Sequence, residues 1–393
     1  MQKEDLFYFA SEGVGEGHPD KMCDQVSDAI LDACIKQDPK SKVALETATK
    51  GDLIVLLGEI SHAGPHIDFE KVARDTVTEI GFDHFSKGID GQNCQVTLKI
   101  AEQDTAIADA VHKEKKNEED LGAGDQGLMF GYATDEFDKD TLFPMSHQLA
   151  NRLCEVMAIK RKSKEIPWLR PDCKTQVIME YKKDGKQIAP VRIYNILIST
   201  QHDEDVDNET IRNTLIEKVI KEVCPAEFLK DTEYIINPSG KFVVGGPDAD
   251  AGLTGRKIIV DTYGGWSPHG GGAFSGKDPS KVDRSAAYYG RYVAKSLVAN
   301  GLCHRALVQV SYAIGLADPL SIHVDSFHTA KEGLTDGDLA RIVKNNFNFR
   351  PYNIIKELDL QRPIFRKTAH FGHFGRNDPD FTWEQPKKDL KLD

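Results

Sequence analysis

Helical and strand-like segments alternate along the whole chain of 393 residues, so the fold must combine both kinds of element. The clearest helix covers residues 19–37, where Met22, Val26 and Ile30 fall on one face and Pro19 suits the first helical position. The same periodicity predicts helices over residues 69–80, 147–160, 209–223, 282–299 and 336–346. Runs rich in β-branched residues predict strands over residues 43–49, 53–60, 94–100, 175–181, 192–200, 256–261 and 305–314.

Two local signals refine this pattern. Lys183-Asp-Gly185 predicts a hairpin turn between two of the strands. The dipeptide Gln-Val opens strand-like runs at residues 95, 176 and 309, which hints at one supersecondary unit used three times. Gln25-Val26 within a predicted helix shows how readily the dipeptide arises by chance.

Length and composition are those of an ordinary globular protein with two or three domains. Apolar residues make up 40% of the chain, and no run approaches the ~18 consecutive apolar residues of a membrane span. The first residues include Glu4 and Asp5 where a secretory signal needs a basic flank. We therefore expect a cytoplasmic protein with no membrane partner.

Cysteine content and net charge exclude several classes of protein. The seven cysteines form no C-x-x-C pair, which favours reduced, buried thiols over disulfides or a zinc site. A net charge of −12 argues against nucleic-acid binding, because such proteins present a basic face. Any polyanionic ligand must be small and held locally, and the candidate cations are Arg256, Lys257, Lys277 and Lys281.

The segment Gly270–Asp278 nearly matches a phosphate-binding P-loop. Two glycines and Lys277 satisfy G-x-x-x-x-G-K, but Asp278 stands where a Ser or Thr hydroxyl would meet Mg²⁺. A carboxylate there would face and repel phosphate oxygens, whereas glycine N–H groups and Lys277 would still attract an anion. Lys281 and Asp283 add a second cation and a candidate metal ligand. The segment predicts polyphosphate binding without Walker geometry, and a solvated surface loop is the alternative.

A second glycine-rich segment, Gly122–Gly127, matches G-x-G-x-x-G but lacks the strand before it and the helix after it that a Rossmann fold requires. A protein-kinase site is excluded because no H-R-D or D-F-G element follows. A tight turn presenting Asp125 remains. The charged residues 112–120 just before it predict a solvated loop or a lid.

The segment Gly15–Lys21 places His18 and Asp20 at a predicted helix N-terminus. Free N–H groups there favour an anion beside His18, with Asp20 as a metal ligand. The alternative is that His18 only caps the helix. A further loop, Asp248–Lys257, again combines glycine, aspartate and adjacent cations, the mixture that a triphosphate with Mg²⁺ requires. His370 and His373 lack a zinc signature and are expected to be structural.

Taken together, Gly17–Lys21, Gly122–Gly127 and Gly270–Asp278 resemble the signature elements of the S-adenosylmethionine synthetases, and the resemblance extends from about Ser11 to Glu384. This family joins ATP and L-methionine into S-adenosylmethionine and then cleaves the displaced triphosphate to phosphate and diphosphate. The resemblance implies two Mg²⁺ per site and K⁺ as cofactors.

Site residues follow from the resemblance position by position. His18 is expected beside the breaking C5′–O bond, and the catalytic set also includes Lys174, Arg256, Lys277 and Lys281. The implied ATP contacts are His18, Asp172, Lys174, Ser239, Lys241, Phe242 (stacked on adenine), Asp250, Arg256, Lys257, Ala273 and Lys277. The implied methionine contacts are Glu59, Gln103, Asp125 (delivered from the neighbouring subunit), Asp250 and Lys281. The implied metal ligands are Asp20 and Asp283 for Mg²⁺, Glu46 for K⁺ and Glu12 for either.

The resemblance also implies an α+β fold of three similar βαβ-type domains around a pseudo-threefold axis, with sheets packing at a homodimer interface. Active sites would lie at that interface, and such dimers often pair into tetramers. The expected divisions are residues 1–103, a mobile active-site loop over 104–120, a central domain over 121–239 and a C-terminal domain over 240–393.

Two other functions stay open from the residues alone. One is a P-loop-like ATPase or phosphotransferase, which the Asp278 mismatch disfavours. The other is a non-catalytic subunit that binds nucleotide and assembles with or regulates a partner.

Overall fold

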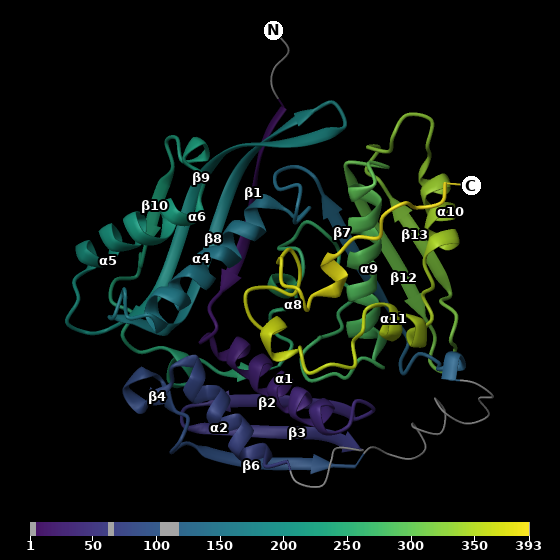
Figure 1. Ribbon diagram of the computed structural model, residues 1–393. Coiled ribbons are helices and arrows are strands. Elements are labelled where there is room, and N and C mark those ends of the chain that lie inside the picture. Colours follow the sequence, from purple (N-terminus) through teal and green to yellow (C-terminus); the bar gives the residue numbers. More distant parts are fainter. Residues whose placement is uncertain (1–4, 62–66, 103–117, 393) are drawn as a thin grey trace.

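The computed structural model describes residues 5–61, 67–102 and 118–392 and repeats one unit three times: a long helix, an antiparallel strand pair and a second helix (Figure 1). The first unit comprises α1 (Pro19–Gln37), β2 (Lys42–Lys50), β3 (Leu53–Ser61), α2 (Phe69–Ile80) and β6 (Gln95–Ala101). The second comprises α4 (Met145–Lys162), β8 (Leu169–Asp184), β9 (Gln187–His202), α5 (Asn208–Leu215), α6 (Lys221–Val223) and β10 (Glu233–Ile236). The third comprises α9 (Val282–Ala299), β12 (Arg305–Tyr312), β13 (Ser321–Asp325) and α10 (Asp336–Asn346).

Each main sheet receives one further strand from a distant part of the chain. β11 (Gly252–Leu253) pairs with β2, β1 (Asp5–Val14) pairs with β8, and β7 (Gly127–Thr134) pairs with β12, all antiparallel. The sheet orders are therefore β11-β2-β3-β6, β1-β8-β9-β10 and β7-β12-β13. β6 and β10 close their sheets in parallel to β3 and β9. Each of these three pairings joins one unit to a segment from another part of the chain.

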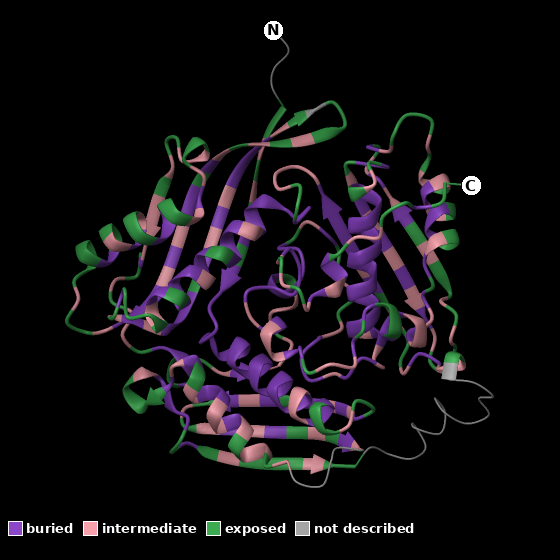
Figure 2. Ribbon diagram, in the orientation of Figure 1, coloured by how far each residue is buried: buried purple, intermediate pink, exposed green. Residues whose placement is uncertain are grey.

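The long helices form the centre of the molecule. Figure 2 shows buried residues gathered on α1 and α9, whereas α2, α5 and α10 carry exposed residues at the periphery. β7 crosses α9 so closely that a Cβ at Gly131 would lie 1.9 Å from the carbonyl oxygen of Gly290, so only glycine fits there. The shorter elements are β4 (Asp83–His84), β5 (Ile89–Asp90), α7 (Gly246–Ala249), α8 (Ile258–Asp261) and α11 (Pro351–Glu357).

Most predicted elements are confirmed. All six predicted helices are present, and a π-helical turn over Ile216–Ile220 interrupts the fourth. Six of the seven predicted strands form, and the β8–β9 hairpin turns at Gly185 with a φ of 63°. All seven cysteines are free and buried, as expected. The combined α+β architecture with three main sheets is confirmed, and β4 and β5 form a further two-stranded sheet.

Two expectations need correction. The predicted strand over 256–261 is wrong, because residues 258–261 form the helical turn α8, whose Asp261 N–H donates to the Lys257 carbonyl. A short apolar run has too few residues to distinguish a strand from a helix by its period. The repeated dipeptide marks equivalent strands only at Gln176 and Gln309, because Gln95 opens the parallel strand β6.

None of the helices in the described part of the chain combines the length and apolar character needed to cross a membrane.

Candidate active site

The candidate site is organised by α1, which lies between the β11-β2-β3-β6 sheet and C-terminal segments (Figure 1). Four aspartates are spaced one turn apart on this helix, at positions 20, 24, 28 and 32, and therefore share one face. We call them the aspartate row. Their partners are Leu253 N–H for Asp20, Gly255 N–H for Asp24, Gly276 N–H and Arg284 for Asp28, and Phe365 and Arg366 N–H for Asp32.

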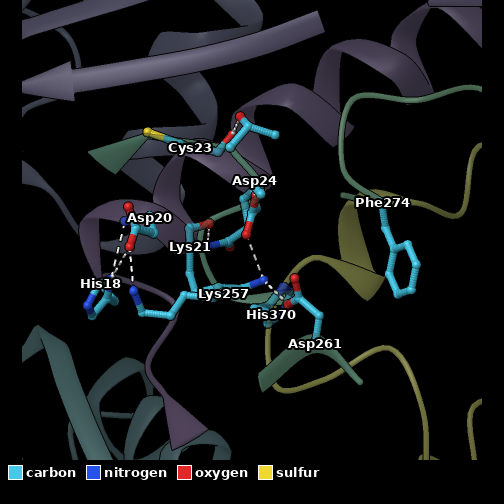
Figure 3. Close-up of polar contacts among 12 residues, drawn as sticks. His18, Asp20, Lys21, Cys23, Asp24, Lys257, Asp261, Phe274 and His370 are labelled. Atoms are coloured by element: carbon cyan, nitrogen blue, oxygen red, sulfur yellow. Dashed lines mark hydrogen bonds and ion pairs between the residues drawn. The ribbon is translucent and has the colours of Figure 1, made fainter. Parts of the chain in front are cut away.

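Four of the predicted site residues meet at the start of α1, and Figure 3 shows three of them, His18, Asp20 and Lys257. His18 is the N-cap residue, and its Nδ1 accepts a hydrogen bond from the Asp20 backbone N–H at 3.2 Å. The Asp20 carboxylate pairs with Lys257 and lies 3.8 Å from Arg256 Nε. We call these four residues the helix-start cluster. The capping role considered for His18 is therefore confirmed, and it places the ring beside two cations.

A buried ionic network lies behind this cluster (Figure 3). Lys21 Nζ donates to Asp24 Oδ2 at 2.8 Å and also to Asp261 on α8. Burial alone would lower the pKa of Lys21, but the two carboxylates outweigh it and raise that pKa above its ordinary value. Lys21 is therefore charged, and it connects α1 to the turn that carries Arg256 and Lys257.

The glycine-rich loop is fixed by close backbone packing against β2. Gly276 has a φ of 79°, and a Cβ there would lie 1.8 Å from the Leu45 carbonyl oxygen. The Gly276 N–H donates to Asp28, and the Gly271 N–H donates to His269 Nδ1, both at 2.8 Å. The expectation that these two N–H groups bind an anionic ligand is therefore wrong, since the Asp28 carboxylate and the His269 ring already accept their hydrogen bonds.

Asp278 also differs from expectation. Its side chain points inward and accepts from the Val43 N–H at 2.9 Å, from Ser280 and from Lys281. Burial raises the pKa of Asp278, but Lys281 and Lys42 outweigh that effect and lower it to about 2. This carboxylate therefore anchors the loop to β2 and does not repel a bound phosphate. The loop also lacks P-loop context, because no strand leads into Gly270 and α9 begins only at Val282.

A second set of predicted residues gathers on this loop. Lys277 pairs with Asp283 at the start of α9, and Lys281 pairs with the inward Asp278. The turn that carries Asp125 lies beside them, because a Cβ at Gly127 would sit 3.7 Å from Asp283 Oδ1. We call Asp125, Lys277, Lys281 and Asp283 the loop cluster. A Cβ on Gly255 would approach Ala273 to 2.4 Å, so the turn before Arg256 touches this loop.

The predicted nucleotide contacts of the central unit lie near the start of β8 and after β10. Asp172 is buried and accepts the Gly246 N–H at 2.8 Å; burial raises its pKa to about 7. Lys174 lies 3.7 Å from Glu12 across the β1–β8 pair and contributes to the low pKa of His18, so it borders the helix-start cluster.

The other residues predicted to bind nucleotide or methionine are more exposed. Phe242 donates its N–H to His202 Nε2 at 3.0 Å, and Lys241 donates to the Glu204 carbonyl. Ser239 is exposed in the same loop, and Asp250 is exposed where α7 ends, close enough to Asp172 to affect its pKa.

Two predicted ligands lie on the outer face of the N-terminal sheet. Glu46 pairs across strands with Leu57, and Glu59 pairs with Ala44, so both carboxylates project to one exposed face. Gln103 and most of the predicted loop over 104–120 fall outside the described residues.

Three sequence models of one family match the chain in order. The N-terminal domain model covers residues 6–105, the central domain model covers 120–242 and the C-terminal domain model covers 244–385. The chain belongs to the S-adenosylmethionine synthetase family. Family members make S-adenosylmethionine from ATP and methionine, which agrees with the resemblance found in the three glycine-rich segments.

The glycine-rich segments are held in place by residues that no sequence motif identifies. Asp24, Asp28, Asp261 and Arg284 are all buried, and none belongs to a glycine-rich motif. The sequence signal that could have found them is the four-residue spacing of the aspartate row. Charged residues at that spacing usually form the solvated face of a helix, so the pattern alone predicts exposed aspartates, not buried ones.

His18 has the electrostatics of a neutral hydrogen-bond donor. Burial lowers its pKa to about 3, and the nearby cations of Lys257 and Lys174 add to the effect. Because Nδ1 accepts the Asp20 N–H, the single proton of the neutral ring lies on Nε2.

We expect the His18 ring to stay neutral, with its proton on Nε2, as the pH falls from 8 to about 5. An ordinary histidine titrates near 6.5 and would be mostly charged at the lower end. Nitrogen NMR of histidine-labelled protein measures this directly, and His18→Gln identifies the signals. A His18 ring that becomes imidazolium with a midpoint near pH 6 would contradict the assignment.

Proposed function

We propose that this protein catalyses ATP + L-methionine + H₂O → S-adenosyl-L-methionine + phosphate + diphosphate. The observation that carries the proposal is the pairing of three predicted phosphate-binding cations with two predicted metal-binding carboxylates. Arg256 and Lys257 face Asp20, and Lys277 faces Asp283. A triphosphate with Mg²⁺ can satisfy both kinds of group at once, because its oxygens take the cations and its metals take the carboxylates.

In the first step the methionine sulfur attacks C5′ of ATP. The C–S bond forms as the C5′–O bond breaks, and the bonding electron pair leaves with the triphosphate oxygen. The thioether is a neutral nucleophile with no proton to lose, so no general base is required. The barrier lies in the charge that grows on the leaving oxygen, and donors fixed in advance lower it most.

We assign one such donor to His18. Its Nδ1 is occupied by the Asp20 N–H, so Nε2–H is available to the leaving oxygen. A depressed pKa keeps the ring from carrying its own charge into the site. Arg256, Lys257 and Lys174 would bind the phosphates beside it, while Lys277 and Lys281 would bind them from the loop cluster.

The carboxylates fit Mg²⁺ held jointly with substrate. No three His, Cys, Asp or Glu side chains converge as a ready-made metal site within residues 5–61, 67–102 and 118–392. Mg²⁺ commonly binds one or two carboxylates together with substrate phosphates, and Asp20 and Asp283 suit that role. Two such ions would neutralise the growing charge on the triphosphate. We assign K⁺ to Glu46, and either K⁺ or Mg²⁺ to Glu12, which lies beside Lys174.

We assign separate groups of residues to the nucleotide and to methionine. We assign adenine stacking to Phe242, with Asp172, Ser239, Lys241, Asp250 and Ala273 around the nucleotide. We assign methionine to Glu59, Gln103, Asp125, Asp250 and Lys281.

We further propose a homodimer with active sites between subunits, and pairing of such dimers into a tetramer. The exposed sheet faces support it: Leu57 on β3, Tyr8 on β1 and Leu128 on β7 each expose at least 39% of their surface. Glu46 and Glu59 lie on the same face as Leu57. Large apolar side chains on a sheet face are typical of association surfaces.

A product assay tests the reaction. Purified protein with ATP, Mg²⁺ and K⁺ should form a sulfonium product together with phosphate and diphosphate, and only when methionine is present. Mass spectrometry and phosphorus NMR identify all three products. Methionine-independent formation of ADP would instead indicate an ATPase, and binding without turnover would indicate a non-catalytic subunit.

Mixed dimers test whether each active site combines the helix-start cluster of one subunit with the loop cluster of the other. His18 and Lys277 belong to different clusters, so mixing inactive His18→Ala and Lys277→Ala proteins should restore activity at one of the two sites of each mixed dimer. Asp125 and Lys277 share the loop cluster, so mixing Asp125→Asn with Lys277→Ala is the matched control and should restore none. Equal results for both mixtures, despite proven subunit exchange, would refute a site built from one cluster of each subunit.

A further inference from the structure

The last three residues of β9 hold the loop that carries Phe242, the residue assigned to adenine stacking. This loop covers residues 237–243, between β10 and α7. At its start, Asn237 accepts the Thr200 N–H on Oδ1 at 2.8 Å and donates from Nδ2 to the Thr200 carbonyl at 3.2 Å. The first residue of the loop is therefore fixed to β9 by its side chain.

His202, the final residue of β9, holds the other end of the loop. Its backbone N–H donates to the Phe242 carbonyl at 3.0 Å, and its side-chain Nε2 accepts the Phe242 N–H at 3.0 Å. The neighbouring Gln201 donates from Nε2 to the carbonyls of Val243 at 3.0 Å and Lys87 at 2.8 Å. Both backbone polar groups of Phe242, and the carbonyl that follows them, are thus bonded to the end of β9.

The hydrogen bonds of the His202 ring determine which nitrogen carries its proton. Nδ1 lies 2.8 Å from the Asp203 carbonyl oxygen, which can only accept, so the proton is on Nδ1. Nε2 faces the Phe242 N–H and is therefore the unprotonated nitrogen. The neutral ring in this tautomer satisfies both neighbours, whereas the opposite tautomer would satisfy neither.

We propose that His202 is a positioning residue for adenosine: by accepting the Phe242 N–H, it holds the Phe242 ring where that ring stacks on adenine. His202 has no exposed surface, so its effect on ATP must pass through Phe242. Both residues belong to one strand–loop contact within one chain, so this role is the same whichever subunit completes the site. It rests on the proposed function, which supplies ATP as the ligand and Phe242 as its adenine contact.

Two variants of similar polarity separate the two ring nitrogens. His202→Gln places an amide oxygen near the position of Nε2 and can still accept the Phe242 N–H. His202→Asn keeps an amide donor near the position of Nδ1 for the Asp203 carbonyl, but it is too short to reach Phe242. Calorimetry on the full-length proteins measures the Kd of the β,γ-imido analogue of ATP, with Mg²⁺ and without methionine. The Kd of tripolyphosphate with Mg²⁺ is the internal control.

We expect His202→Asn to weaken binding of the ATP analogue about tenfold, the scale of one buried N–H group left without its acceptor. The Kd of tripolyphosphate should stay within about twofold of wild type, because this ligand has no adenine and a loss of stability alone does not change the Kd of folded protein. His202→Gln should keep both affinities within about threefold of wild type, because it retains the acceptor.

Wild-type affinity for the ATP analogue in His202→Asn, or equal weakening of both ligands, would overturn the role of His202. If His202→Asn does not fold, His202→Gln decides the question, and a tenfold weaker Kd for the analogue alone would overturn the role.

A double variant tests whether His202 acts through Phe242. Phe242→Ala should weaken binding of the ATP analogue and spare tripolyphosphate, and adding His202→Asn should then cost little more. Residues that act independently give additive losses, so a further tenfold loss in the double variant would contradict the role.

The outcomes for this role and for the proposed reaction are separable. Wild-type protein that binds the ATP analogue but forms no sulfonium product with ATP and methionine would refute the reaction and leave the role of His202 standing. Phe242→Ala protein with wild-type affinity for the analogue would overturn that role and leave the reaction standing.

Discussion

Four carboxylates on one face of α1 determine which distant segments of the chain pack against this helix. Burying a carboxylate in a protein interior is costly unless hydrogen bonds and an opposite charge compensate it. The aspartate row finds its partners in segments 253–257, 276–284 and 365–366, which are distant in sequence. Removing one member of a pair such as Asp28–Arg284 would leave the other charge buried, at a cost of about 3–5 kcal/mol. The helix therefore fixes the N-terminal unit against the C-terminal one, and the candidate site forms along that contact.

The same arrangement explains how an acidic protein can hold a polyanion. The chain carries a net charge of −12, but its candidate phosphate-binding cations are concentrated in two clusters beside α1. Each cluster pairs those cations with aspartates, so neither holds a large uncompensated charge. A triphosphate with metal ions can replace these internal ion pairs. Its oxygens can bind the lysine and arginine side chains, and its metal ions can bind the aspartates. Binding of that kind needs local pairing and no basic surface.

Much of the fold could be predicted from the sequence, because helices such as α1 and α9 show a clear apolar period, and α1 also has Pro19 in its first turn. The pairing of β1, β7 and β11 could not be predicted. Each of these strands pairs with a strand far along the chain, and local patterns carry no information about that pairing. For the site, the motifs did indicate His18, Asp20 and Lys277. The inward turn of Asp278 was not predictable, because the direction of its carboxylate depends on β2, which lies more than two hundred residues earlier.

If the helix-start cluster and the loop cluster bind one triphosphate, its oxygens and metal ions replace the internal ion pairs of both clusters. A crystal structure with S-adenosylmethionine, imidotriphosphate and Mn²⁺ in place of Mg²⁺ tests this exchange, because anomalous scattering locates the metal. We expect one Mn²⁺ within about 2.2 Å of Asp20 and another within about 2.2 Å of Asp283, the range for a hard divalent cation on oxygen, with Lys257 and Lys277 moved onto phosphate oxygens. Imidotriphosphate bound elsewhere, or bound with the Lys257–Asp20 and Lys277–Asp283 pairs still intact, would contradict it.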